Sequence, residues 1–182
     1  MSTKSGVVVT RPPINWTSVI VGGFFAGVIG GILMGVAATL WSGAAGLGAS
    51  TPWEAIAATF YGPLAFVGAA GVTTIGVLLH LSFAAGFGVV FSVLAAKFRH
   101  PVKLFFWGIL YGTAVWALMT WVFVPNFDAT LGARLTMIPV MWFFLHWIYG
   151  AFTGLFIPPM RSIFRPRIQV QPQPLQGHQA AA

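Results

Sequence analysis

Four long runs of apolar residues dominate the chain, and each run is continuous rather than alternating. They extend from about Ser18 to Trp41, Val72 to Ala96, Leu104 to Val124 and Ile138 to Pro158, and none contains Asp, Glu, Lys or Arg. A helix needs about 20 mostly apolar residues to cross a bilayer, whereas the strands of a membrane barrel alternate apolar with polar positions. The pattern therefore predicts an all-α, polytopic membrane protein with four transmembrane helices.

The segments between the runs predict shorter elements. Thr51-Pro52-Trp53-Glu54 has the spacing of a capping box with proline at the first helical position. We therefore expect a short helix from Pro52 to about Tyr61, where Gly62-Pro63 interrupts it. Its aromatic residues and single charge favour an interfacial helix on the outer leaflet, with a re-entrant segment as the alternative. The second external segment, Pro125 to Thr136, is expected to be a loop.

The ends of the chain differ from its middle. We expect residues 1–15 to be a cytoplasmic N-terminal segment and residues 16–164 to form the transmembrane domain. Residues 165–182 are rich in Pro, Gln and small side chains. Such a composition cannot bury enough apolar surface to fold, so this tail is predicted to be disordered and cytoplasmic.

Composition and charge strengthen the membrane interpretation. Only 6% of the 182 residues are charged, against about 25% in soluble proteins. The cations are concentrated on one side of the spans: Lys4, Arg11, Lys97, Arg99, Lys103, Arg161, Arg165 and Arg167. Arg134 alone lies on the other side, so the positive-inside rule places both termini in the cytoplasm and the protein in the cell inner membrane. The high pI of about 11 then reflects topology and attraction to anionic headgroups rather than nucleic acid.

The same composition disfavours an enzyme. The chain has no cysteine and only two carboxylates, Glu54 and Asp128. The lack of cysteine excludes thiolate metal sites and cysteine nucleophiles, and two carboxylates leave almost nothing for acid–base catalysis. Neither a phosphate-binding loop nor a zinc-protease motif occurs in the sequence. We predict a protein without catalytic residues and without a metal site.

The two halves of the chain resemble each other. Leu79-His80-Leu81 matches Leu145-His146-Trp147 at a spacing of 66 residues, and Gly31 matches Gly108 at a spacing of 77. An insertion in the first external loop explains the difference between the two spacings. The sequence thus predicts two tandem helical hairpins, about 16–100 and 101–164, as parallel repeats related by an axis along the membrane normal.

Small residues recur at four-residue intervals along every span. The longest stripe, on the first span, is Gly23, Gly27, Gly31 and Gly35, and the others include Gly88, Gly108, Gly112 and Gly154. Such stripes let membrane helices approach closely. We interpret them as packing faces, with a pore lining or a dimer face as the alternative. The first-span stripe is the best candidate for a homodimer seam.

Two histidines are the candidate functional residues. His80 precedes Lys97 by 17 residues, or about 25 Å of helix, and His146 has a similar distance to Arg161, so both should lie in the outer part of the membrane. Ionisable groups there are functional candidates by default. One interpretation is two neutral, structural rings that each bond a hydroxyl or carbonyl on a neighbouring helix. The other is axial ligation of haem b or a chlorophyll-type pigment.

The second half of the chain resembles a family. His80, the basic turn before Lys103-Leu104, Pro125 and His146 are arranged much as in the YagU-like bacterial inner-membrane proteins and related four-helix families. The resemblance covers about Leu79 to Arg167. It implies a location in the cytoplasmic membrane and a stress or envelope role, with no reaction attached.

Together these features predict a non-enzymatic integral inner-membrane protein, as an accessory subunit or a small helical-bundle module. We expect no cofactor, and partners limited to the lipid bilayer and a homodimer or larger membrane complex. Two alternatives stay open. One is a tetrapyrrole-binding electron-transfer or pigment protein that uses His80 and His146, and the other is a small oligomeric transporter or channel.

Overall fold

The computed structural model describes residues 14–165, and every regular element in that range is helical. Four segments are long and apolar enough to cross a membrane. They are α1 (Trp16–Ala44), α3 (Val72–Leu94), the segment Pro101–Phe127 that starts with α4 (Pro101–Leu118), and α7 (Pro139–Ile163). The prediction of an all-α protein with four such helices is confirmed. The expected N-terminal segment and C-terminal tail lie almost entirely outside the described residues.

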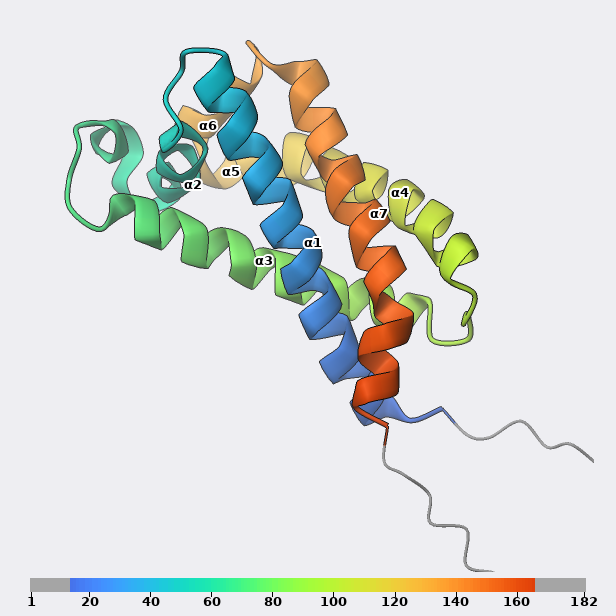
Figure 1. Ribbon diagram of the computed structural model, residues 1–182. Helices are drawn as coiled ribbons and strands as arrows, with labels where there is room; N and C mark the ends of the chain where they lie inside the picture. The colour runs from blue at the N-terminus through green and yellow to red at the C-terminus, as the bar shows by residue number, and fades with distance from the viewer. Residues whose placement is uncertain (1–13, 166–182) are drawn as a thin grey trace, which may run out of the picture.

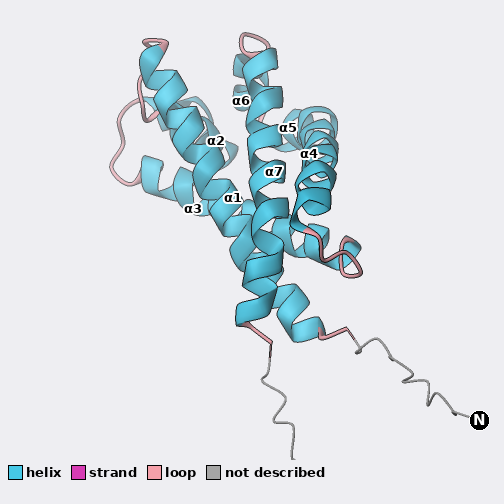
Figure 2. Ribbon diagram, turned by 45° about the vertical axis from the view of Figure 1, so that its right-hand side comes forward, coloured by secondary structure: helices cyan, strands magenta, loops and turns pink. Residues whose placement is uncertain are grey.

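The antiparallel pair α1 and α7 forms the centre of the molecule (Figure 1). α3 packs against α1, and α4 packs against α7, so the order across the molecule is α3, α1, α7, α4. The backbones of α3 and α4 lie close at few positions, although the Tyr111 hydroxyl of α4 donates to the Phe87 carbonyl of α3 at 2.8 Å. The start of α1 and the end of α7 lie together at one end, which we call the closed end. Toward the opposite, open end the two helices diverge (Figure 2).

Glycines bring α1 and α3 into backbone contact. A methyl group at Gly27 would collide with the backbone of Ala84 and Gly88, and one at Gly23 would collide with Ser92. Gly31 lies against the Ala84 side chain. The stripe predicted on the first span is therefore a packing face inside this chain. Because α3 already covers it, the prediction of a homodimer seam at this stripe is wrong.

The seam between α4 and α7 is built in the same way. Gly108 lies on the backbone of Gly150, Gly112 on that of His146, and Gly154 on that of Leu104. In the seam between α1 and α3, Gly27 makes the contacts that Gly108 makes in this seam. The sequence match had paired Gly108 with Gly31 instead. In terms of contacts, the register predicted between the first and third spans is therefore one helical turn off.

A second glycine face on α1, which the stripe analysis missed, packs against α7. Gly22 lies against the Arg161 backbone and side chain, and Gly30 lies against Thr153 and Tyr149. A two-fold relation between the halves would require α3 and α4 to pack as closely as α1 and α7, and they do not. The internal duplication stays a prediction about the sequence, because the two hairpins do not pack symmetrically.

Arg161 fixes the closed end. The sequence places it after the fourth span, but α7 continues through Pro158 and Pro159 to Ile163, and Arg161 is only 5% exposed. Its guanidinium donates to the carbonyl oxygens of Ser92, Ala95 (3.2 Å) and Phe98 (3.3 Å). These carbonyls belong to the C-terminal end of α3 and the turn after it, where backbone acceptors lack helical partners and a positive charge is favourable.

The third span changes its winding before it ends. After α4 comes a π-helical turn, η2 (Met119–Phe123), in which the Val124 N–H bonds the Met119 carbonyl. Pro125 lies just beyond, inside α5 (Val124–Phe127). Proline has no N–H to donate, so a shift in the hydrogen-bond ladder at this point has a direct cause.

The segment expected to be a second external loop is mostly helical. Besides α5 it contains α6 (Ala129–Leu135), which Asp128 caps by accepting from the Leu131 N–H at 2.8 Å. The other carboxylate oxygen of Asp128 accepts from the Thr59 hydroxyl at 2.8 Å. A buried carboxylate thus joins α2 to the segment before α6, and the prediction of a loop over Pro125 to Thr136 is wrong.

The segment between α1 and α3 contains the expected short helix. α2 (Thr51–Tyr61) ends before Gly62, which has a φ of 54°, and the 3-10 turn η1 (Gly62–Phe66) follows. The capping box is wrong, since Ser50 is the N-cap residue and the Thr51 hydroxyl donates to the Leu47 carbonyl at 2.5 Å. α2 packs against α3 and α6. Its location on the outer leaflet stays a prediction.

Candidate functional site: an apolar cavity between the diverging helices

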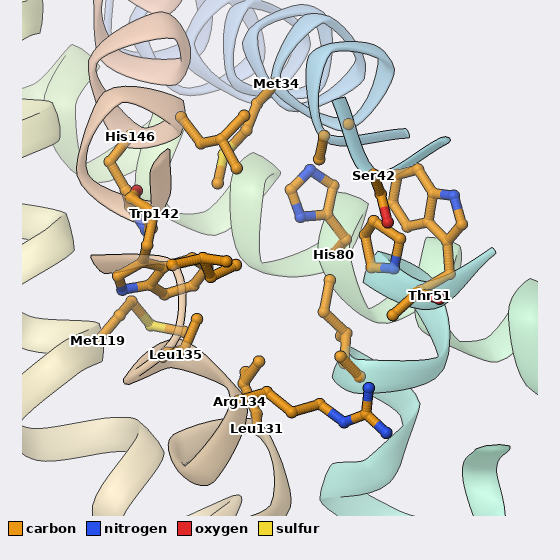
Figure 3. A pocket seen from close by; sticks show the side chains of 18 of the residues that line it. Met34, Ser42, Thr51, His80, Met119, Leu131, Arg134, Leu135, Trp142 and His146 are labelled. Carbon is orange, nitrogen blue, oxygen red and sulfur yellow. The ribbon is translucent and has the colours of Figure 1, made fainter. Parts of the chain in front are cut away.

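A cavity of about 550 Å³ fills the fork between the helices at the open end (Figure 3). Its walls come from α1, α2, α3, α4, α6 and α7. Most of the lining is aliphatic or aromatic, and His80 and His146 both belong to it. The structure therefore brings the two predicted site residues to one cavity, on separate walls provided by α3 and α7 (Figure 3).

The identity of the residues on α1 and α7 explains why the fork opens. Toward the closed end, glycines such as Gly30 allow the backbones to touch. Beyond them the facing positions carry larger side chains, including Met34 on α1 with Leu145 and Tyr149 on α7. Tyr149 donates to the Ala84 carbonyl of α3 at 2.8 Å, which closes the base of the cavity.

His80 bonds a backbone carbonyl on a neighbouring helix, which is the partner that the sequence predicts for a structural histidine. Its Nε2 lies 2.9 Å from the Gly31 carbonyl oxygen of α1. The Trp53 indole packs edge-on against the imidazole, with 5.5 Å between the ring centroids. These contacts fix the plane of the ring and leave Nδ1 without a hydrogen-bond partner among residues 14–165.

His146 has a partner on its own helix rather than on a neighbouring one. Its Nδ1 lies 2.8 Å from the Trp142 carbonyl oxygen, one turn earlier in α7. The side chain is only 3% exposed, and the Trp142 indole packs against it at 4.3 Å between centroids. Nε2 has no hydrogen-bond partner within the described part of the chain.

Two threonine hydroxyls of the third span bond tryptophans of α7 rather than the histidines. Thr120 accepts from the Trp142 indole N–H at 2.9 Å, and Thr113 accepts from that of Trp147 at 2.8 Å. The first bond joins η2 to α7, and the second joins α4 to α7. Thr120 therefore positions His146 through Trp142, and neither threonine bonds a histidine.

The remaining hydroxyls of the lining are also used within the chain. Ser42 donates to the Gly48 carbonyl at 2.7 Å, Thr51 donates to Leu47, and Thr59 donates to Asp128. Three lining residues have donors with no hydrogen bond in the described part of the chain: Trp41, Trp53 and Arg134. The guanidinium carbon of Arg134 lies 3.5 Å from the centroid of the Phe66 ring. The free histidine nitrogens are thus the unused acceptors that characterise this site.

Tryptophans shape the cavity. Trp41, Trp53 and Trp142 line it, whereas Trp121 is 67% exposed and lies elsewhere. The Trp53 indole occupies the space that a side chain at Gly35 would need. Trp53 also borders a smaller hollow of about 260 Å³ between exposed aliphatic residues of α1 and α3. One indole therefore separates the cavity from a groove on the apolar outer surface.

The lining of this cavity suits the binding of apolar molecules. No group of three His, Cys, Asp or Glu side chains that could hold a metal ion occurs in the described residues. Buried hydrophobic surface drives association with apolar molecules, while a few polar atoms set their orientation. In this cavity the aliphatic and aromatic residues supply the apolar surface, and side chains such as His80 and His146 supply the polar atoms.

Sequence reasoning found the two histidines but missed most of the site. Of the predicted packing glycines only Gly35 touches the cavity, and the others form the seams that hold its walls. The α6 residues Leu131, Arg134 and Leu135 were overlooked. A signal for them existed, because Asp128 as a cap, leucines four residues apart and a final Arg indicate a short helix.

Comparison of the chain with protein-family models, with curated proteins and with solved structures finds no match. The resemblance to YagU-like proteins therefore stays a prediction.

Proposed function

We propose that this protein is a non-enzymatic integral membrane protein that takes an apolar small molecule from the bilayer into the cavity at the open end. As a binding protein it would serve as an accessory subunit or small helical-bundle module of a larger membrane assembly. The observation that carries the proposal is the cavity itself, with its volume of about 550 Å³, apolar walls and two partnered histidines. Ligand pockets are typically about 300–1,000 Å³ and mostly apolar, with few polar groups.

The direct test is native mass spectrometry of the protein purified in a mild detergent. We expect the 19.5 kDa chain to carry one adduct of lipid-like mass after the detergent has been removed, and solvent extraction to release that molecule. The bare chain mass, combined with no displacement of an environment-sensitive apolar dye by any extracted lipid, would contradict the proposal.

The proposal includes a topology. We place both termini in the cytoplasm and the open end of the cavity toward the outer leaflet of the inner membrane, on the strength of the cation distribution. A reporter fused after Ala182 should be active only as a cytoplasmic fusion, and one inserted at Gly68 should be active only outside. The opposite pair of results would mean that the open end of the cavity faces the cytoplasm.

A tetrapyrrole pigment is a second candidate, and one observation favours it. His146 donates from Nδ1 to a carbonyl and presents Nε2, which is how metal-ligating histidines are commonly oriented. His80 does not fit as a second axial ligand of this kind, because its Nε2 bonds Gly31. A visible absorption spectrum decides between the candidates: a Soret band lost in His146→Phe would replace the lipid with a pigment, and a colourless protein would leave the first proposal in place.

A further inference from the structure

The hydrogen bonds of the two histidines determine which nitrogen carries the proton. A carbonyl oxygen only accepts, so the ring nitrogen bonded to it must be the donor. His80 therefore carries its proton on Nε2, and His146 carries its proton on Nδ1. In a neutral imidazole the other nitrogen has a lone pair and accepts. Nδ1 of His80 and Nε2 of His146 are thus both acceptors.

The surroundings favour the neutral form of both rings. No Asp or Glu is among the residues that line the cavity, and the charged side chain that does line it, Arg134, is itself a cation. A buried charge without a partner is expensive. The cavity therefore presents two neutral acceptors on different walls and no anion.

Neither acceptor has a donor in the described part of the chain. The lining donors that have partners donate to other groups: Ser42, Thr51, Thr59, Tyr149 and the Trp142 indole. Arg134 and the indoles of Trp41 and Trp53 also line the cavity, and none of them bonds either ring. A buried acceptor that loses its water and finds no donor is destabilising. A bound molecule that brings its own donors removes this penalty, whereas one that offers only acceptors does not.

We propose that the ligand of the cavity is an apolar molecule with two hydroxyl groups, of the hydroquinone class, which donates one hydrogen bond to His80 Nδ1 and one to His146 Nε2. This inference rests on the proposed function and names its ligand. The oxidised, quinone form of such a molecule has carbonyl oxygens in the same places. Those oxygens face the two lone pairs, so the site discriminates in favour of the dihydroxy form.

The test compares two ligands of nearly equal shape. One is 2-decyl-1,4-dihydroxybenzene, kept reduced, and the other is its 1,4-dimethyl ether, which has no donor. Binding is measured by calorimetry in a mild detergent. We expect the diol to bind about tenfold tighter or more, the loss that one or two unpaired buried acceptors produce.

Variants connect this preference to the histidines. His80→Phe and His146→Phe should bind the ether as the natural chain does, which shows an intact cavity, and should lose most of the preference for the diol. Phe87→Leu is the control and should keep the preference for the diol, because Phe87 lines the cavity with no polar side-chain atom. Equal affinities for diol and ether in the natural chain would overturn the hydroxyl selectivity while leaving the proposed function standing. Failure of both compounds to bind, with no lipid adduct on the purified protein, would overturn both.

Discussion

The closed end and the open end of this molecule use the same helices for opposite purposes. Toward the closed end Gly22 and Gly30 bring α1 into contact with the backbone of α7, and the guanidinium of Arg161 fills the remaining polar space. At the open end Met34 and Leu145 hold α1 and α7 apart, and a cavity results. The difference shows that side-chain size along one helix can determine both where a membrane protein closes and where it binds.

The largest expected effect on stability comes from placing a large side chain in the seam between α1 and α3. Gly88→Leu places side-chain atoms where the Gly27 backbone lies, so the two helices must separate. We expect the free energy of unfolding, measured by titration with a denaturing detergent, to fall by about 3 kcal/mol or more, the upper range for overpacked cores. Gly86→Leu is the matched control, because Gly86 is on the same helix with nothing within 4 Å of its Cβ position. Equal losses in both variants would contradict the seam.

A smaller loss should follow from removing the guanidinium at the closed end. Arg161→Met leaves the carbonyls of Ser92 and Ala95 buried without that donor. Each unsatisfied buried group costs about 1–3 kcal/mol, so we expect a loss of roughly 2 kcal/mol in the same titration. Arg99→Met, at an exposed position, should change stability by less than about 0.5 kcal/mol. Similar losses of stability in the two variants would mean that Arg161 does not stabilise the closed end and serves only as a positive charge that sets the topology.

The smallest effect on stability is expected where the chain has room. Ala38 lines the cavity, so Ala38→Phe adds a ring to empty space and should change the free energy of unfolding by less than about 1 kcal/mol, below the usual penalty for overpacking. Ligand affinity should nevertheless fall about tenfold, because the ring takes the ligand's place. Val36→Phe, on the exposed face of α1, should leave affinity unchanged. A large destabilisation by Ala38→Phe would mean that the fork is closed.

Hydrophobic patterning and spacing were sufficient to predict the four spans, α2 and the two histidines. These features depend on each segment's own composition, which the sequence displays directly. The pairing of helices depends on which face meets which neighbour. Gly22, Ala26 and Gly30 form a second row of small residues on α1 at four-residue intervals. The row does not indicate which helix it meets, so the contact between α1 and α7 was not predicted.

The burial of Arg161 was missed for a related reason. Local sequence makes it one more cation after an apolar run, and its partners Ser92 and Ala95 come from another helix. The cavity itself follows from the divergence of α1 and α7, a property of the assembled fold. α6 was missed for a different reason. The cap residue Asp128 and the leucine spacing were visible in the sequence, but the segment was nevertheless assigned as a loop.

Photo-crosslinking with an apolar diazirine probe in mild detergent tests the cavity most directly. The account predicts crosslinks at Met34, Ala38 and Leu145 that an excess of the extracted lipid or the dihydroxy compound competes away. Crosslinks at the exposed residues Val36 and Leu40 should persist under competition, because they face the detergent. Labelling confined to Val36 and Leu40, or unaffected by competitor at every position, would contradict a ligand-binding cavity at the open end.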